Sequence, residues 1–155
     1  MPYWQFFYHI VWATKNRERL LTPELEPLAH EFLRTKAMGL DTTVFALNGM
    51  PDHVHLVVSI PPKLAVATFI GQLKGASSTR LSKHYPPFAW QEEYGAFSFD
   101  KKRLPHYVKY VERQKTHHAE GTLITALEQV AGKNAEPAQP DNSGTAVPKE
   151  RRRTK

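Results

Sequence analysis

The sequence predicts an α+β fold built on an antiparallel sheet, and three observations indicate it. Segments rich in aromatic and β-branched residues are separated by segments with helical periodicity. The chain of 155 residues has the length of one domain, and its hydrophobic content of 41% is sufficient for a buried core. From Gly132 onwards Pro, Gly, Asn, Ser and Ala dominate without periodicity. We therefore expect a single domain over residues 1–131 and a disordered basic tail over residues 132–155.

The first half of the chain predicts a strand, a helix and then two strands joined by a turn. Thr22 is a typical N-cap and Pro23 suits the first helical position, while Gly39 is a typical stop for the helix that follows. The segments on either side of this helix are rich in β-forming residues, and the turn at 49–52 contains Gly and Pro. The predicted strands cover residues 3–14, 42–48 and 53–60.

The second half predicts two further helices around a short strand. Pro61 and Pro62 end the third strand, and apolar residues then recur at helical spacing. The order β-α-β-β-α-β-α is that of a ferredoxin-like (RRM-like) antiparallel sheet with helices on one face, plus an added C-terminal helix. This fold supports many functions and does not indicate one by itself. The predicted elements are a helix from 64 to 83, a strand at 95–99, a helix at 104–118 and a weaker helix at 122–130.

Composition excludes several classes of protein. The chain has no cysteine, which excludes disulfides, thiolate metal sites and cysteine catalysis. The N-terminus lacks the pattern of a signal peptide, and the apolar runs are shorter than the roughly 20 residues of a membrane span. We therefore expect a cytoplasmic protein without a membrane partner. The net charge of +6 favours a polyanionic partner. Six basic and three acidic residues lie in 133–155, so half of that charge belongs to the tail.

Two histidines of the predicted third strand are expected on one face of the sheet. Side chains alternate along a strand, so His53 and His55 share a face with Val57, while Val54 and Leu56 point to the other. The hydrophobic set of that other face is complete without the histidines. Two imidazoles placed in this way can bind one divalent cation. The alternative interpretation is a pair of incidental strand histidines.

The helix predicted at 104–118 carries a second group of polar side chains. Tyr110 and Gln114 are four residues apart, so they are expected on one flank of the helix, beside its buried stripe. The glutamine carbonyl oxygen is a neutral ligand, and a metal there would lie one helical turn from the tyrosine. Alternatively, Tyr110 is an amphipathic boundary residue and Gln114 is solvated. The expected buried stripe consists of Leu104, Val108 and Val111, with Tyr107 at its edge.

Five segments of the chain resemble a known family in the same order. Residues 50–58 (MPDHVHLVV) are similar to the histidine–hydrophobic–histidine (HUH) motif of single-tyrosine transposases of the insertion-sequence 200/605 group, which includes the REP-associated tyrosine transposases. Residues 110–114 (YVERQ) are similar to that family's Tyr-x-x-x-Gln signature. The resemblance covers about residues 3–118. Its other segments are residues 8–17 (YHIVWATKNR), residues 73–78 (LKGASS), and Trp90 with residues 94–98 (YGAFS).

The resemblance implies a reaction and a partner. It implies a bacterial or archaeal enzyme in which His53, His55 and Gln114 bind Mg²⁺ or Mn²⁺ and Tyr110 attacks single-stranded DNA. The product would be a 5′-phosphotyrosyl link and a free 3′-hydroxyl, and a second strand end would then reverse the link without ATP. The resemblance further implies recognition of a DNA hairpin and a homodimer, with a monomer as the alternative. In the dimer, an active site either closes within one chain or combines the histidines of one chain with the tyrosine of the other. The ligand set by itself, rich in imidazole, favours zinc or manganese over magnesium.

Further polar residues are candidates for supporting roles. His9 is expected to be a packed, hydrogen-bonded histidine or a residue that orients a ligand. Tyr107 is the second candidate nucleophile, and His117 and His118 are assigned no metal role. Basic side chains of the predicted domain are candidate phosphate contacts. They are Lys15, Arg17, Lys74, Arg80, Lys83, Lys101, Lys102 and Arg103.

Two other functions compete with the transposase hypothesis. The first is a non-catalytic module that binds single-stranded nucleic acid on a ferredoxin-like sheet, which requires stacking aromatic residues on the central strands. The histidines occupy such positions in the predicted third strand, which argues against this function. The second is an unrelated metal hydrolase that uses His53, His55 and a carboxylate. Asp52 is adjacent, but in a regular strand its side chain would point to the opposite face.

Overall fold

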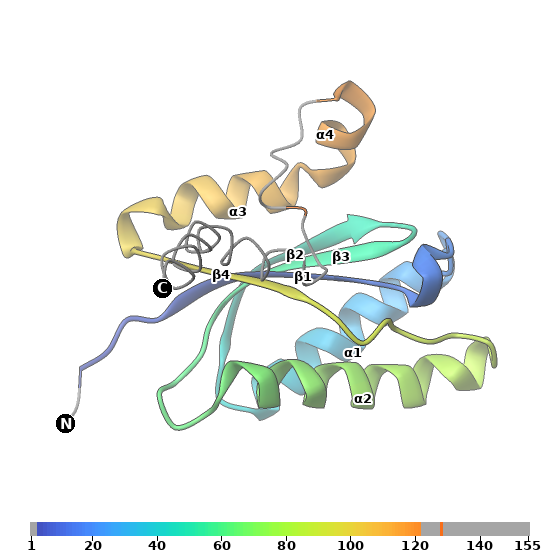
Figure 1. Ribbon diagram of the computed structural model, residues 1–155, viewed down its shortest axis with the longest axis horizontal. Helices are drawn as coiled ribbons and strands as arrows, with labels where there is room; N and C mark the ends of the chain where they lie inside the picture. The colour runs from blue at the N-terminus through green and yellow to red at the C-terminus, as the bar shows by residue number, and fades with distance from the viewer. Residues whose placement is uncertain (1–2, 122–127, 129–155) are drawn as a thin grey trace, which may run out of the picture.

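The structure is a computed structural model that describes residues 3–121 and residue 128 (Figure 1). The alternation of strands and helices follows the predicted order up to the last helix. Short 3₁₀ turns occur at Lys15–Arg17 and Lys101–Arg103. The elements are β1 (Phe7–Ala13), α1 (Leu25–Gly39), β2 (Thr43–Met50), β3 (His53–Ser59), α2 (Val66–His84), β4 (Gly95–Phe99), α3 (Leu104–Glu112) and α4 (Gln114–Glu120).

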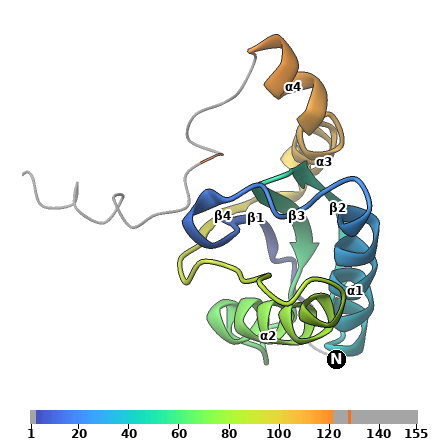
Figure 2. The same ribbon diagram turned by 90° about the vertical axis from the view of Figure 1, so that its right-hand side faces the viewer.

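The strands form one antiparallel sheet in the order β2-β3-β1-β4. This is the order of a ferredoxin-like sheet, which confirms the predicted α+β fold. Helices α1 and α2 cover one face of the sheet, and α3 and α4 lie on the other (Figure 2). The central strands β1 and β3 are therefore covered on both sides, and β3 is buried from His53 to Val58. Polar residues of β3 that point towards α3 are enclosed like core residues.

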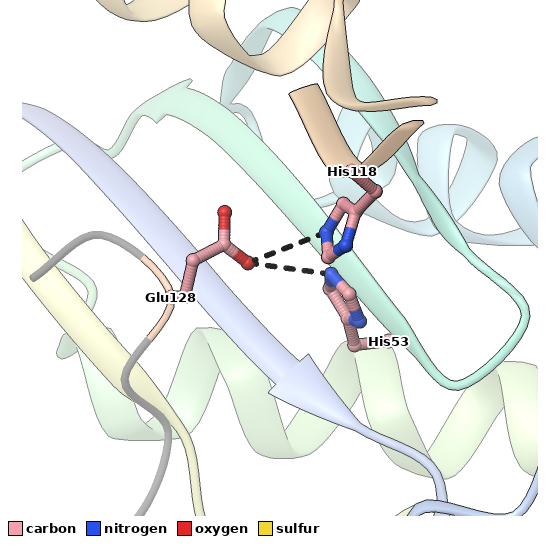
Figure 3. A group of neighbouring side chains, drawn as sticks. All are labelled: His53, His118 and Glu128. Carbon is pink, nitrogen blue, oxygen red and sulfur yellow. Dashed lines mark ion pairs between the residues drawn. The ribbon is translucent and has the colours of Figure 1, made fainter. Parts of the chain in front are cut away.

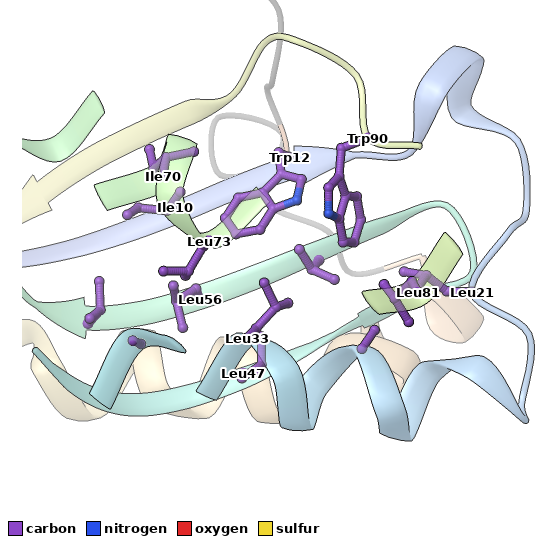
Figure 4. Packing of buried hydrophobic residues seen from close by; sticks show 14 of the residues in the cluster. Ile10, Trp12, Leu21, Leu33, Leu47, Leu56, Ile70, Leu73, Leu81 and Trp90 are labelled. Carbon is purple, nitrogen blue, oxygen red and sulfur yellow. The ribbon is translucent and has the colours of Figure 1, made fainter. Parts of the chain in front are cut away.

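The larger core lies between the sheet and the pair α1 and α2 (Figure 4). Alternate residues of the central strands, among them Ile10, Trp12 and Leu56, point into this layer and are fully buried. Trp12 packs edge-on against Trp90 with 5.7 Å between ring centroids, and the Trp90 indole Nε1 donates to the buried Ser77 Oγ at 2.9 Å. Burying each large apolar side chain stabilises a fold by about 1.5–3 kcal/mol. This layer holds the sheet rigid beneath its other face.

The opposite face carries a smaller apolar cluster beneath α3. It contains the buried residues Ala46, Val57, Tyr110 and Val111. Aromatic residues at its edge include Tyr107, whose ring stacks on Phe99 with 4.2 Å between centroids. The prediction that placed Tyr110 beside the buried stripe is therefore wrong. Tyr110 is 3% exposed and lies within the stripe, whereas Tyr107 is only partly buried.

The single helix predicted at 104–118 is two helices in the structure. Helix α3 ends at Glu112, and Arg113 adopts φ −102° and ψ 23° before α4 begins at Gln114. The helix axis changes direction between α3 and α4 (Figure 1). Helical periodicity continues across the break, which is why the sequence pattern does not reveal it. As a consequence, Tyr110 and Gln114 belong to different helices.

Other boundaries shift by a few residues. Strand β1 begins at Phe7 instead of residue 3, and α1 begins at Leu25, whose backbone N–H donates to the predicted cap Thr22 Oγ1 at 3.2 Å. The weak helix predicted at 122–130 lies outside the described residues except for residue 128, and the predicted tail at 132–155 lies wholly outside them. Within residues 3–121, no helix has the length and apolar character needed to cross a membrane.

The hairpin that begins β3 depends on a glycine, and this dependence is testable. A Cβ added at Gly49 would lie 2.2 Å from the backbone oxygen of His53, so the Gly49→Ala substitution should force the hairpin apart and cost about 1–3 kcal/mol. Gly75 in α2 has no atom within 4 Å of its added Cβ. We therefore expect Gly75→Ala to stabilise the protein by about 0.5–1 kcal/mol. Urea unfolding of both variants measures the difference, and equal stabilities would contradict the prediction.

Candidate active site

His53 and His55 lie on the sheet face that α3 and α4 cover. Their neighbour of the same parity, Val57, belongs to the cluster under α3, whereas Val54 and Leu56 belong to the larger core. The predicted strand parity is therefore confirmed. Both histidines are almost fully buried, and their ring centroids lie 5.0 Å apart. The two imidazoles, two residues apart on the same face of β3, thus share one enclosed space.

Tyr110 and Gln114 close this space from the helical side. The Tyr110 ring lies edge-on to His55 at 6.1 Å between centroids. Gln114 is fully buried at the start of α4, where the break at Arg113 turns it towards the sheet. The structure thus brings together all four residues that the sequence analysis selected. It does so within one chain.

A fifth residue, Glu128, lies at the centre of the group and was not predicted. Its Oε1 is 3.0 Å from His55 Nε2 and 3.4 Å from His53 Nε2. Its Oε2 accepts hydrogen bonds from Tyr110 Oη and, at 3.2 Å, from Gln114 Nε2. The carboxylate therefore touches every predicted site residue. Glu128 lies 14 residues beyond Gln114, and no spacing rule in the sequence connects the two.

His118 of α4 also points towards this carboxylate. Figure 3 shows the ion pairs that link Glu128 to His53 and to His118, the latter with 3.7 Å between Nε2 and Oε1. One ligand atom from each of these three residues lies within 4.8 Å of the others, so the three together could hold a metal ion. From the sequence we expected no metal role for His118, and its position in this group differs from that expectation. No sequence pattern would have paired it with His53.

The histidine ring atoms suit a divalent cation. His53 Nδ1 donates to Asp52 Oδ1 at 2.7 Å, so its Nε2 presents a lone pair towards Glu128. That Nε2 is buried and, among the described residues, has no hydrogen-bond partner. An imidazole whose other nitrogen donates to a carboxylate is the usual form of a metal-binding histidine. Nitrogen and oxygen donors around one point are therefore in place for a metal.

The side-chain amide of Gln114 turns its nitrogen, and not its oxygen, towards the centre of the site. Its Oε1 accepts from His118 Nε2 at 3.0 Å, while its Nε2 faces the Glu128 carboxylate. To offer its oxygen to a metal, Gln114 must reverse its amide and give up the bond to His118. The His118 nitrogen that donates to Gln114 is also the one that would bind a metal, so His118 cannot do both at once.

Asp52 departs from its expected orientation. The alternation argument placed its carboxylate on the opposite face, but Asp52 lies in the turn before β3, where strand alternation does not apply. Its two oxygens contact His53 Nδ1 and, at 3.4 Å, Arg17 Nε. Burial raises the pKa of Asp52, but the hydrogen bond from His53 and the charges of His53 and Arg17 lower it further, so the net pKa lies below its ordinary value. Asp52 orients His53 and does not reach the shared space itself.

The protonation equilibria follow from this packing. Burial alone would lower the pKa of His53, yet its contacts with the carboxylates of Glu128 and Asp52 raise the pKa above the ordinary value. Burial dominates at His55 and lowers its pKa despite Glu128. Burial likewise raises the pKa of Glu128, but the contact with His53 and the hydrogen bonds from His55 and Tyr110 hold it well below its ordinary range. Glu128 is therefore an anion inside the site.

The candidate phosphate contacts fall into separate regions. Arg17 lies at the site, because its guanidinium is near both Asp52 and His53. Lys74 donates to the backbone oxygens of Gln91, Glu92 and Glu93, which gives it a role within the chain, and burial lowers its pKa to about 8. Arg80 stacks on Phe32 on the side of α1 and α2. The remaining candidates are Lys15 beside Arg17, Lys83 in α2, and the exposed Lys101, Lys102 and Arg103 before α3.

A small basic cavity lined by residues of α3 and α4 adjoins the tyrosine. Its volume is about 160 Å³, and it is lined by His106, Lys109, Tyr110, Arg113 and His117. No acidic residue lines it. The Tyr110 ring stacks on His117 with 4.6 Å between centroids. The cavity therefore leads from solvent to the tyrosine through a basic surface that suits an anion.

Comparison with known sequences connects the chain to one family. Residues 2–114 match the family model described as "Transposase IS200 like". The ISDra2 transposase TnpA of Deinococcus radiodurans is 31% identical over 119 residues, which cover 72% of this chain and 85% of that protein. The transposase of insertion sequence element IS200 from Salmonella typhimurium is 33% identical over 82 residues, 53% of this chain. The match spans only about half (54%) of that relative.

Solved structures agree in fold. A putative transposase from Deinococcus radiodurans R1 superposes with a TM-score of 0.61 at 28% identity, covering 73% of this chain and 93% of that one. A REP-associated tyrosine transposase bound to a REP hairpin gives a TM-score of 0.60 at 14% identity, covering 76% and 72%. The second likeness concerns the fold alone.

The pairing of Glu128 with His53 predicts a pH-dependent stability. His53, with its raised pKa, contributes stability below its ordinary value of 6.5, and loses it as the pH rises through the raised pKa. Glu128, with its lowered pKa, contributes stability above its ordinary value of 4.5, and loses it as the pH falls below that value. We expect Glu128→Gln to lower the melting temperature most between these two values.

Thermal unfolding from pH 4 to about pH 8.5 measures this effect. Glu24→Gln is the matched control, because Glu24 is exposed and precedes α1 on the far side of the sheet. A melting-temperature difference that does not change with pH, or one shared by the control, would contradict the ion pair.

Proposed function

Because the chain belongs to the IS200-like transposase family, whose members carry out DNA transposition, we propose that it cuts and rejoins single-stranded DNA with Tyr110 as nucleophile and a metal bound by His53, His55 and Gln114. One observation carries the proposal: these four side chains converge on a single anion, the Glu128 carboxylate. A scissile phosphate is also an anion with two oxygens that need such partners. The donor set therefore supports phosphodiester chemistry.

In this reaction the phenol oxygen of Tyr110 attacks the phosphorus atom. The phenol gives up its proton, the bond from phosphorus to the 3′ oxygen breaks, and a 5′-phosphotyrosine forms. The departing 3′ oxygen takes up a proton to become a hydroxyl, so the step releases and consumes one proton. The 3′-hydroxyl of another strand end reverses the step and restores the tyrosine. A bound Mg²⁺ or Mn²⁺ supplies charge neutralisation at the phosphate and polarises it towards attack. Tyr110 is held for this role by its buried ring, which packs between His9, His55 and His117.

Glu128 makes the same contacts that this reaction requires of the DNA and the metal. A DNA phosphate that enters the site must displace the Glu128 carboxylate or share the metal with it, because two adjacent anions repel each other. The basic cavity is lined by Tyr110, and the guanidinium of Arg17 contacts Asp52 and lies near His53, so both adjoin the site. They support a path for a single strand across the face of α3.

The proposed partner is single-stranded DNA that contains a hairpin. A relative of the same fold, the REP-associated tyrosine transposase, was solved with a REP hairpin, which makes a hairpin the natural probe. We further propose a homodimer, with a monomer as the alternative. The nucleophile and the candidate ligands meet within one chain, so the site does not require a second copy for its residues.

The competing hypothesis of a non-catalytic binding module requires exposed aromatic residues on the central strands. The corresponding positions on β1 and β3 are His9, His53 and His55, and α3 covers them. Bases could not stack there without removal of the helix. This arrangement favours the catalytic hypothesis.

The nucleophile is tested with a covalent-adduct assay. Labelled hairpin oligonucleotides with single-stranded flanks are incubated with protein and Mn²⁺ and separated on a denaturing gel. We expect a protein–DNA band for the wild type and for Tyr107→Phe, and none for Tyr110→Phe. The reason is that Tyr110 donates to the Glu128 carboxylate, which occupies the position proposed for the DNA phosphate. An adduct that persists in Tyr110→Phe would exclude this tyrosine.

The metal ligand is tested by separating cleavage from binding. His53→Ala should abolish Mn²⁺-dependent cleavage and leave hairpin binding largely unchanged, since the imidazole lies in the enclosed site and not on the outer surface. The matched control is His84→Ala at the exposed end of α2, which should cleave like the wild type. Equal loss of cleavage and of thermal stability in His53→Ala would instead assign the histidine a structural role.

A further inference from the structure

His9 forms the most buried polar contact of the site and has no role in the proposed reaction so far. It lies on β1 opposite the strand of the metal-binding histidines and is fully buried. Its Nε2 is 2.8 Å from His55 Nδ1, and the two rings are nearly parallel, with 5.0 Å between centroids and 10° between planes. Its other nitrogen, Nδ1, has no hydrogen-bond partner among the described residues. Among the described residues, the contact with His55 is thus the hydrogen bond that the His9 ring makes.

The hydrogen bond constrains where protons can lie. His9 is fully buried, and the group it meets is an imidazole and not a carboxylate, so the neutral ring is the favoured form. Two neutral imidazoles joined by one hydrogen bond share one proton, and one ring must donate while the other accepts. His55 Nε2 faces the acceptor Oε1 of Glu128 at 3.0 Å and therefore holds the proton in this state. His55 Nδ1 must then accept from His9 Nε2–H.

Metal binding through His55 Nε2 requires the reverse arrangement. The Nε2 lone pair becomes available only when the ring proton moves to Nδ1. Among the described residues, the hydrogen-bond partner of that Nδ1 is His9 Nε2. His9 must then accept the hydrogen bond and carry its own proton on Nδ1. A side chain that could not change from donor to acceptor would hold His55 in the wrong form.

We propose that His9 is a positioning residue that fixes the ring orientation of His55 and exchanges donor and acceptor roles with it, so that Nε2 of His55 can bind the metal. The inference rests on the proposed metal site. It goes beyond that site, because it assigns the last buried histidine on this face a function that packing alone does not require. Packing alone would be served by an apolar ring between the neighbouring Phe97 and Tyr107.

Two substitutions separate positioning from packing. His9→Leu removes the hydrogen bond and keeps an apolar group of similar size. His9→Gln keeps an amide that can donate to or accept from His55 Nδ1 after reversal. Phe97→Leu is the matched control, since it removes an aromatic neighbour of His9, with 5.9 Å between ring centroids, and leaves the bond to His55 intact.

Mn²⁺ binding to the DNA-free protein, followed by electron paramagnetic resonance, is the first measurement. We expect His9→Leu to lower the Mn²⁺ affinity by about 10- to 100-fold, as loss of a ligand's hydrogen-bond partner does elsewhere. His9→Gln should restore most of this affinity, and Phe97→Leu should retain it. Wild-type affinity in His9→Leu, or equal losses in the leucine and glutamine variants, would overturn the inference.

Nitrogen-15 NMR of the imidazoles is the second measurement and needs no activity. In the metal-free wild type we expect the His55 proton on Nε2, and after addition of Mg²⁺ on Nδ1. A proton on His55 Nδ1 before metal addition would contradict the exchange of roles. If the metal-free pattern holds but no metal binds the wild type, the proposed metal site fails while the His9–His55 contact stands. If His9→Leu does not fold, His9→Gln and the wild-type spectra still decide the inference.

Discussion

Three imidazoles from two paired strands lie in a layer closed to water, and this burial is the constraint on which the rest of the site depends. His9, His53 and His55 point to the same face because β1 and β3 are antiparallel neighbours in matching register. A buried polar group left without a partner costs about 1–3 kcal/mol. The partners that satisfy these rings, Asp52 for His53 and His9 for His55, therefore also fix their orientation. The same hydrogen bonds therefore stabilise the buried histidines and set the orientation of their rings.

The break between α3 and α4 affects how the helices cover the three histidines. A continuous helix would carry Gln114 along the axis of α3. The turn at Arg113 instead directs α4 so that Gln114 and His118 face the histidine strand. The apolar residues of α3, with Val111 fully buried, anchor the first helix to the sheet and leave the second free to differ in direction. Tyr110, the proposed nucleophile, is thus held by packing, and the proposed ligand beyond it is held by polar contacts.

The sequence predicted the features of this arrangement that depend on neighbouring residues, and it missed those that depend on residues far apart in the chain. Strand parity is local, so the common face of His53 and His55 was predictable from four residues of alternation. The break at Arg113 was not, because helical spacing continues through it. Asp52 was misplaced by applying strand alternation to a residue in a turn. Glu128 and His118 were missed for another reason: their contacts with His53 join segments that are far apart in the chain, and no periodicity connects them.

The contacts of the Glu128 carboxylate indicate that the surrounding side chains suit an oxyanion as well as a metal. Three imidazole nitrogens lie near its Oε1, and a phenol and an amide donate to its Oε2. Such donors stabilise negative charge on two oxygens of one small group, and a phosphodiester offers the same pair of oxygens. Asp52 is already a counter-charge for a protonated His53, so a ligand inside the site is needed for the nitrogens that face Glu128. An anion can accept hydrogen bonds from these nitrogens and a metal can bind their lone pairs, and a phosphate with a bound cation would supply both.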